Sequence, residues 1–120
     1  MNFNDYYWHD SVIKSISINR NNPGIIDEIS FDIQWNEGIL ERLNFEDVYW
    51  ASLMLNFGIV ADETIMRANV LDNNDSDLVN FYEKWGGLMD NVKLQVYLIE
   101  LNSTGSLIKI IAKGFKTITL

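Results

Sequence analysis

A run of strict alternation from Ile29 to Trp35 constrains the fold of this 120-residue chain more than any other feature. Apolar side chains stand at every second position, with polar ones between them: Ile29, Ser30, Phe31, Asp32, Ile33, Gln34, Trp35. Successive side chains of a strand point to opposite faces of a sheet. The pattern therefore predicts a strand with one face in a core and the other in water.

A second strand is predicted just before this one. From Val12 to Ile18 every second residue is apolar except Lys14, so Val12, Ile16 and Ile18 are expected on the core side. The segment 21–24, Asn-Asn-Pro-Gly, holds the only proline of the chain and is a strong turn signal. The two strands should form an antiparallel hairpin.

The middle of the chain continues the strand pattern. A turn at 36–38, Asn-Glu-Gly, precedes a predicted third strand over 39–45. Residues 48–55 are apolar almost throughout, which fits a fully buried strand or a buried helical turn, and a strand is favoured. Residues 64–71 fit a short helix or a strand equally well.

One principal helix is predicted over about 76–86. Ser76 is the expected N-cap, and Gly86 with Gly87 should end the helix. The three- and four-residue spacing of the apolar positions indicates one covered face. The residues of that face are Leu78, Phe81, Tyr82 and Trp85.

The C-terminal part predicts a long hairpin from residues 92–101 and 107–112, with a further short strand over 115–119. A four-residue loop from Ser103 to Ser106 would place Glu100 opposite Lys109. It would also place Leu98 opposite Ile111. The expected fold is a single α+β domain over 1–120, with a mostly antiparallel sheet of about five to seven strands and one helix.

The charge of the chain is strongly negative. Seventeen acidic and nine basic residues give a formal net charge of −8, and residues 1–90 alone carry −11. This charge disfavours nucleic acids and anionic membranes as partners. The chain has no cysteine, no apolar run of the ~20 residues that span a bilayer, and a polar, aromatic start over 1–10. We therefore expect a cytoplasmic protein.

The residues that could carry chemistry are few. His9 is the only histidine, and its neighbours Asp10 and Ser11 cannot form a relay with it, because adjacent side chains of an extended segment diverge. Asp72, Asn74, Ser76 and Glu83 match the first, third, fifth and twelfth positions of a calcium loop. The sixth position needs glycine and holds Asp77. The sequence predicts no catalytic, cofactor or metal-binding residue.

Three segments of the chain resemble known proteins when taken together. They are residues 8–11 (Trp-His-Asp-Ser), residues 56–59 (Asn-Phe-Gly-Ile), and residues 102–106 followed by Ile108, Lys109 and Ile110. The whole chain resembles small bacterial cytoplasmic proteins of unknown function, which are similar in style to immunity proteins of polymorphic toxin systems. This resemblance implies a toxin or effector as partner and brings no catalytic residues with it.

Three functional hypotheses follow. The first is a protein-binding module of the immunity type, which covers a basic partner with its acidic surface. Its candidate residues are Glu41, Glu46, Asp47, Asp72, Asp75 and Asp77. The second is a small ligand-binding domain or enzyme with an aromatic pocket near Trp8, His9 and Asp10. The third is a homodimer formed through a strand edge.

Overall fold

The computed structural model describes residues 1–120 and contains six strands, one α-helix and one short 3-10 helix. All strand pairs are antiparallel, and the sheet closes on itself in the order β1-β2-β3-β6-β5-β4. The elements are η1 (Phe3–Asp5), β1 (Val12–Asn22), β2 (Ile26–Gln34), β3 (Leu40–Met54), β4 (Glu63–Val70), α1 (Ser76–Lys84), β5 (Gln95–Leu101) and β6 (Leu107–Thr119). The predicted α+β class with one helix and five to seven strands is confirmed.

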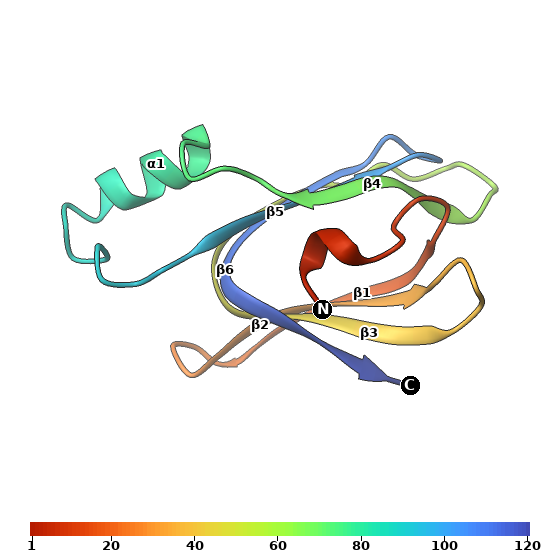
Figure 1. Cartoon of the computed structure of the whole chain (residues 1–120), viewed down its shortest axis with the longest axis horizontal. Helices are drawn as coiled ribbons and strands as arrows, with labels where there is room; N and C mark the ends of the chain where they lie inside the picture. Colours follow the sequence, from red (N-terminus) through yellow and green to blue (C-terminus); the bar gives the residue numbers. More distant parts are fainter.

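The closed sheet has two layers joined by the long strands β3 and β6. Figure 1 shows β4 and β5 in the upper layer, β1 and β2 in the lower layer, and β6 bending from one layer to the other. Residues 39–45 and 48–55, which were expected as separate elements, are both parts of β3, and residues 115–119 are the end of β6. The bend in β3 lies where Asp47 has a φ of 52° and where Tyr49 is an extra residue in a bulge between Val48 and Trp50.

The main core lies inside the closed sheet. The alternation of β2 is confirmed, because Ile29, Phe31, Ile33 and Trp35 are buried whereas Ser30, Asp32 and Gln34 are only half-buried. Further inward side chains come from β3, β4, β5 and β6 and include Leu43, Phe45, Ile65, Ile99, Ile108 and Ile110. The short helix η1 lies between the two layers (Figure 1), and its Phe3 belongs to the same core.

The predicted inward set of β1 is wrong in part. Ile13 and Ile16 contact the core, whereas Ile18 is exposed. Lys14 is the extra residue of a bulge between Ile13 and Ser15, so the two-residue period is reset at this point. The segment 64–71, which fitted helix or strand, forms β4, and there Met66 is the extra residue of a similar bulge.

The N-cap of helix α1 lies one residue earlier in the chain than predicted. Asp75, rather than Ser76, is the N-cap, and its carboxylate accepts hydrogen bonds from the backbone N–H groups of Asp77 and Leu78. Of the predicted covered face, Leu78 and Phe81 are buried and Tyr82 is half-buried, but Trp85 is 45% exposed. The helix ends before the two glycines, as expected. No helix of the structure has both the length and the apolar character needed to cross a bilayer.

Helix α1 covers the outer side of the sheet. Its residues Leu78 and Phe81 form a second, smaller cluster with Leu94, Val96 and Ile111. Trp50 of β3 packs against this cluster. Residues 48–55 are therefore not a fully buried strand: Trp50 is half-buried, and several of its neighbours are exposed.

The register of the last hairpin differs from the prediction by two residues. The loop has four residues, but it spans 102–105, because the backbone N–H of Leu101 already bonds to the carbonyl of Ser106. Glu100 therefore lies opposite Leu107, and Leu98 lies opposite Lys109. Side chains set this register. Ser106 is buried, its N–H bonds to the Thr104 hydroxyl, and its hydroxyl accepts from the N–H of Asn56.

Candidate binding groove

The N-terminal aromatic residues form a packed anchor. Trp8 is buried, and its indole N–H donates to the carbonyl of Phe3 at 2.8 Å. Its ring contacts those of Phe3, Tyr6 and Trp35, with centroid distances of 4.5, 5.7 and 5.2 Å. None of the four principal hollows of the molecule is lined by Trp8, His9 or Asp10. Packing of the N-terminus against the sheet therefore accounts for these aromatic residues better than a pocket does.

The structure does not bring His9, Asp10 and Ser11 together as a relay. The Nδ1 atom of His9 lies 3.1 Å from the carbonyl of Met66, and its Nε2 atom lies 3.5 Å from the carboxylate of Asp10. Ser11 is buried on the other side, and its hydroxyl donates to the carbonyl of Tyr7 at 2.9 Å. The only histidine is thus on the surface, without a nucleophile beside it.

The calcium-like spacing falls across a loop and a helix. Asp72 and Asn74 lie in the connection after β4, whereas Ser76 and Glu83 are part of α1. A calcium loop wraps its ligands around one point, which a helix over its second half prevents. No group of three or more acidic or histidine side chains in the structure is placed to hold a metal ion.

The three candidate acidic residues of β3 have different surroundings. Glu41 accepts a hydrogen bond from the indole N–H of Trp35 at 2.7 Å. Glu46 pairs with Lys116 of β6 at 3.0 Å, and this carboxylate raises the pKa of Lys116. Asp47 is exposed and has no ion pair. Of the three, Asp47 alone has neither an ion pair nor a side-chain hydrogen bond.

The three candidate residues near α1 are also unequal. Lys109 of β6 bonds to the carboxylates of Asp75 at 2.8 Å and Asp77 at 2.6 Å. Burial by itself would raise the pKa of Asp75, but the bonds from Lys109 and from the backbone of α1 outweigh it and leave this pKa below its usual value. Asp75 therefore holds the helix in place. Asp72 is exposed and has no ion pair.

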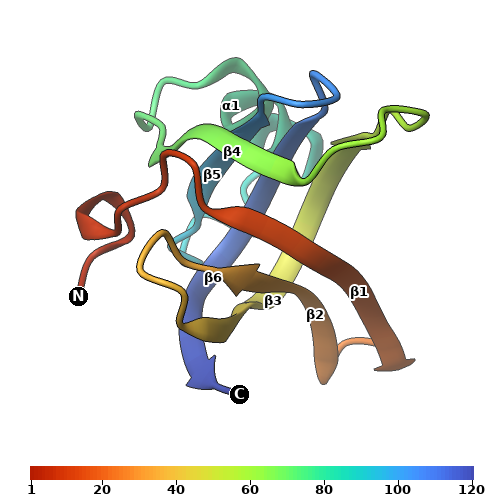
Figure 2. The ribbon, with the colours of Figure 1, turned by 90° about the vertical axis from the view of Figure 1, so that its right-hand side faces the viewer.

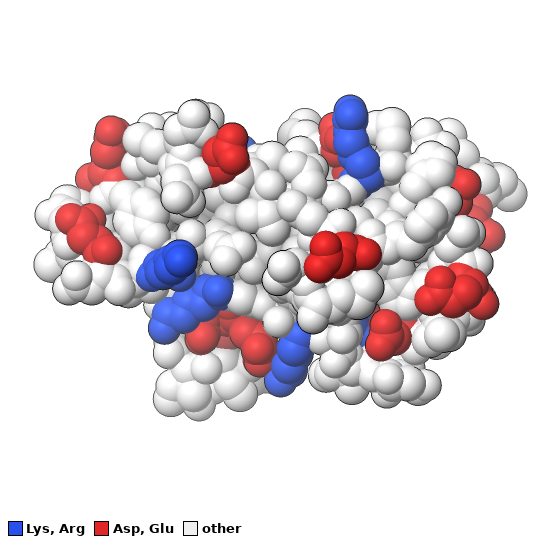
Figure 3. All heavy atoms as spheres, in the orientation of Figure 1, with Lys and Arg blue, Asp and Glu red and all other residues white.

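The charged side chains do not gather into one acidic patch on the face shown in Figure 3. At several places red and blue atoms lie next to each other, and uncharged surface separates one such place from the next. The six candidate residues belong to two groups, one on β3 and one around the start of α1. The negative charge of the chain is thus spread and partly neutralised by ion pairs.

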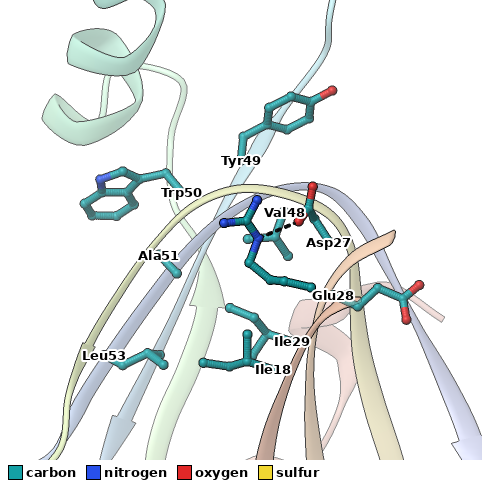
Figure 4. A pocket seen from close by; sticks show the side chains of 10 residues that line it. Ile18, Asp27, Glu28, Ile29, Val48, Tyr49, Trp50, Ala51 and Leu53 are labelled. Carbon is teal, nitrogen blue, oxygen red and sulfur yellow. Dashed lines mark hydrogen bonds and ion pairs between the residues drawn. The ribbon is translucent and has the colours of Figure 1, made fainter. Parts of the chain in front are cut away.

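The largest hollow opens between the β1–β2 hairpin and the second half of β3. It has a volume of about 590 Å³ and is lined by ten residues: Ile18, Arg20, Asp27, Glu28, Ile29, Val48, Tyr49, Trp50, Ala51 and Leu53. Figure 4 shows Ile18, Ile29 and Leu53 pointing toward one another at its base, whereas Tyr49 and Trp50 point toward the helix side. The base of the hollow is apolar and borders the main core.

A second hollow, of about 430 Å³, continues along β1. It is lined by residues 13–16 of β1 on one side and by residues 55–59, which follow β3, on the other. The first hollow uses Ile18 and Arg20 of β1 and residues 48–53, so both hollows lie between the same two stretches of chain. We call them together the β1–β3 groove. In Figure 2 the second half of β3, in yellow, crosses behind β1.

Two strand edges beside this groove have no neighbour. Strand β3 pairs with β2 only up to Phe45, so its residues from Val48 to Met54 pair with β6 alone. Strand β1 pairs with β4 only at Val12 and Ile13. The bend of β3 causes this opening, because it turns the second half of the strand away from β2.

The segment from Val48 to Ala61 contains no charged residue and is largely exposed. Its exposed apolar residues are Tyr49, Met54, Leu55, Phe57, Ile59 and Val60. Phe57 is 84% exposed, and Val60 is fully exposed. Exposed apolar surface is often found at interaction sites, which makes this segment a candidate. Sequence reasoning interpreted part of this segment as buried core, although the absence of charge over fourteen residues was a usable signal.

Acidic residues are in excess around the mouth of the groove. Arg20 and Asp27 pair at 2.8 Å, and Asp27 also accepts a bond from the N–H of Gly24. The Gly24 bond and, after it, the Arg20 guanidinium hold the pKa of Asp27 below its usual value. The charged residues that line the two hollows are three carboxylates, Asp27, Glu28 and Glu63, and two cations, Lys14 and Arg20. The groove thus has one more negative than positive group.

Comparison with protein-family models, with curated proteins and with solved structures finds no match for this chain.

Proposed function

We propose that this chain is a protein-binding module of the immunity type, which covers a basic toxin or effector with the β1–β3 groove and its acidic mouth. The observation that carries the proposal is the exposed, uncharged segment from Val48 to Ala61 beside two unpaired strand edges. The proposal includes a cytoplasmic location, which rests on the absence of cysteine and on the resemblance to cytoplasmic proteins.

The energetics of the groove favour a macromolecular partner. Burying apolar surface contributes about 25 cal/mol for each Å² removed from water, so large exposed side chains such as Phe57 offer the most on binding. A basic partner would first be drawn by the net charge of −8 and then held by the apolar contacts. The acidic mouth thus acts on the association rate, and the apolar base acts on the affinity.

The larger hollow of the groove is a weaker candidate for catalysis than for binding. The titratable residues of its larger hollow are Arg20, Asp27, Glu28 and Tyr49, and the first two are paired with each other. Acid–base or nucleophilic chemistry needs a base held against a reacting group. No histidine and no serine line this hollow. Binding therefore explains its residues better than a reaction does.

Affinity capture from the native cell tests the proposal. The tagged wild-type chain should retain one partner protein, identified by mass spectrometry, and Phe57→Asp should lose it because a charge would enter the apolar contact. Leu88→Asp is the matched control, because Leu88 is 82% exposed and lies after α1, away from the groove. It should retain the same partner.

Two outcomes contradict the proposal. The first is that no protein is retained by the wild type above the background of an untagged strain. The second is that Phe57→Asp and Leu88→Asp retain the partner equally, which would place the contact outside the β1–β3 groove. Circular dichroism of both variants should match that of the wild type, since substitutions of exposed side chains change stability little.

A further inference from the structure

We propose that the partner contributes an extended basic segment, which adds as a strand to the free edge of β3 at Ala51 and Leu53. This inference rests on the proposed function and specifies the partner's binding element. The apolar side chains of the segment would enter the β1–β3 groove, and its basic side chains would face the acidic mouth. Strand addition of this kind obtains affinity from backbone hydrogen bonds and specificity from alternate side chains.

The direction of the backbone groups in the second half of β3 follows from one hydrogen bond at the turn between β5 and β6. The N–H of Leu101 bonds to the carbonyl of Ser106. In β6 near this turn, the backbone N–H and C=O groups of even-numbered residues therefore point toward β5, and those of odd-numbered residues point toward β3. The odd-numbered residues of β6 lie opposite Trp50, Ser52 and Met54 of β3.

Ala51 and Leu53 alternate with these residues, so their N–H and C=O groups are directed away from β6. This part of β3 lies after the bulge at Tyr49 and contains no further register shift. No strand lies on that side.

This edge carries none of the features that normally prevent pairing with other chains. Exposed edges are usually protected by lysine, proline or inward-pointing charge. The residues from Val48 to Met54 contain no charge and no proline. The edge is seven residues long, which is enough for an ordinary strand. An edge of this kind is suited to a partner strand.

The side chains around the edge indicate the chemistry of that strand. Alternate residues of an added strand would point toward Ile18 and Ile29 at the base of the larger hollow, which favours apolar side chains there. The intervening residues would lie near the mouth, where two lining carboxylates, Asp27 and Glu28, stand against one cation, Arg20. The expected segment therefore alternates apolar and basic residues.

A second copy of this chain is a poorer occupant of the same edge. A pair of chains joined at β3 would bring two acidic mouths together, and like charges brought close are unfavourable. It would also join molecules that each carry a net charge of −8. The charge around the groove thus selects a basic partner over self-association.

Amide hydrogen exchange with synthetic peptides tests the inference. The probe is a capped seven-residue peptide that alternates lysine and isoleucine, and its control replaces each lysine with glutamate. In the free protein the Ala51 and Leu53 amides should exchange faster than those of Trp50 and Ser52, which bond to β6. The lysine peptide should slow Ala51 and Leu53 by at least about tenfold, and the glutamate peptide should leave them unchanged.

A proline substitution provides a second, matched test. Ala51→Pro removes the N–H that points to the free edge and leaves the bonds to β6 in place, so the protein should fold and lose binding of the lysine peptide. Ala51→Val introduces a side chain similar in size to that of proline but keeps the N–H, so it should retain binding. Thermal unfolding of both variants establishes that they are folded.

Three results would overturn the inference. The Ala51 and Leu53 amides could remain unprotected by the lysine peptide, or Ala51→Pro, shown to be folded, could bind it as well as Ala51→Val. The third is protection of both amides in the protein alone together with a dimer in analytical ultracentrifugation, which would assign the edge to a second copy. The first two results leave the dependence of partner capture on Phe57 untouched, so they are distinguishable from failure of the proposed function.

Discussion

At the scale of single residues, the acidic side chains divide into those that hold the fold and those that have no ion pair. Asp75 caps α1 and, with Asp77, binds Lys109, whose side chain is largely buried. Asp47 and Asp72 are exposed and have no ion pair. A sequence shows the number of carboxylates, whereas only the fold determines which of them receive cations from distant strands.

The cap of α1 gives a first prediction. Asp75→Ala should lower the free energy of unfolding by about 1–2 kcal/mol, because the N–H groups of Asp77 and Leu78 lose their acceptor. Ser76→Ala, the substitution that the sequence alone would select, should change it by less than about 0.5 kcal/mol. Urea denaturation measures both values. Equal effects would mean that Asp75 is not the cap.

The lowered pKa of Asp75 predicts a dependence on pH. A carboxyl group whose pKa is lower in the folded than in the unfolded state stabilises the protein at pH values above its unfolded pKa, here 3.8. This contribution is lost as the pH falls through the folded pKa. The difference in stability between wild type and Asp75→Asn should therefore be largest near neutral pH and shrink below pH 3.8. A difference that grows on acidification would contradict the assignment.

The core of the closed sheet gives a third prediction. Phe31 is fully buried and packs edge-on against Phe45, with ring centroids 5.8 Å apart. Phe31→Ala should lower the free energy of unfolding by about 3–5 kcal/mol, from lost transfer energy and the cavity left behind. Phe57→Ala is the control, and its exposed ring should make the change less than about 0.5 kcal/mol. Similar losses for the two variants in urea denaturation would place Phe31 outside the core.

At the scale of elements, periodicity predicted where the strands lie but not how they bend. The alternation from Ile29 to Trp35 was enough to orient β2, because this stretch has no bulge. Single extra residues at Lys14, Tyr49 and Met66 shift the alternation in β1, β3 and β4. A bulge depends on the pairing of two strands, so the pattern of one strand does not reveal it.

The bend of β3 can be tested at Asp47, which has a φ of 52°. This conformation is unfavourable for side chains branched at Cβ and free of cost for glycine. Asp47→Val should lower the free energy of unfolding by about 1–2 kcal/mol, whereas Asp47→Gly should leave it equal or slightly higher. Thermal unfolding compares the two. If both variants lose the same stability, the side chain of Asp47 and not its backbone conformation supports the bend.

At the scale of the whole molecule, the fold class could be predicted and the candidate groove could not. The groove exists because the β3 bend separates its second half from β2, a consequence of pairing between segments distant in sequence. Residues 48–55 were interpreted as buried because apolar residues are usually buried. Their lack of charge continues through Ala61, and that longer run is the feature that distinguishes this exposed segment from a core strand.

The net charge predicts how association with a captured partner depends on salt. The Debye length shrinks from about 30 Å at 0.01 M to about 8 Å at 0.15 M, so steering by the charge of −8 weakens over this range. The association rate in surface plasmon resonance should fall markedly and the dissociation rate should change less. A dissociation rate that changes more than the association rate would indicate that ion pairs, rather than apolar contacts, hold the complex.

The central claim is that a partner protein binds the β1–β3 groove. Its most direct test is amide hydrogen exchange of the full chain, alone and with the captured partner, read along the whole sequence by mass spectrometry. Slower exchange in the complex should centre on residues 48–60 and extend to residues 14–20 of β1, while residues 76–84 of α1 and residues 1–10 exchange as in the free chain. Slowing confined to α1 or to the N-terminal residues, with 48–60 unchanged, would contradict the account.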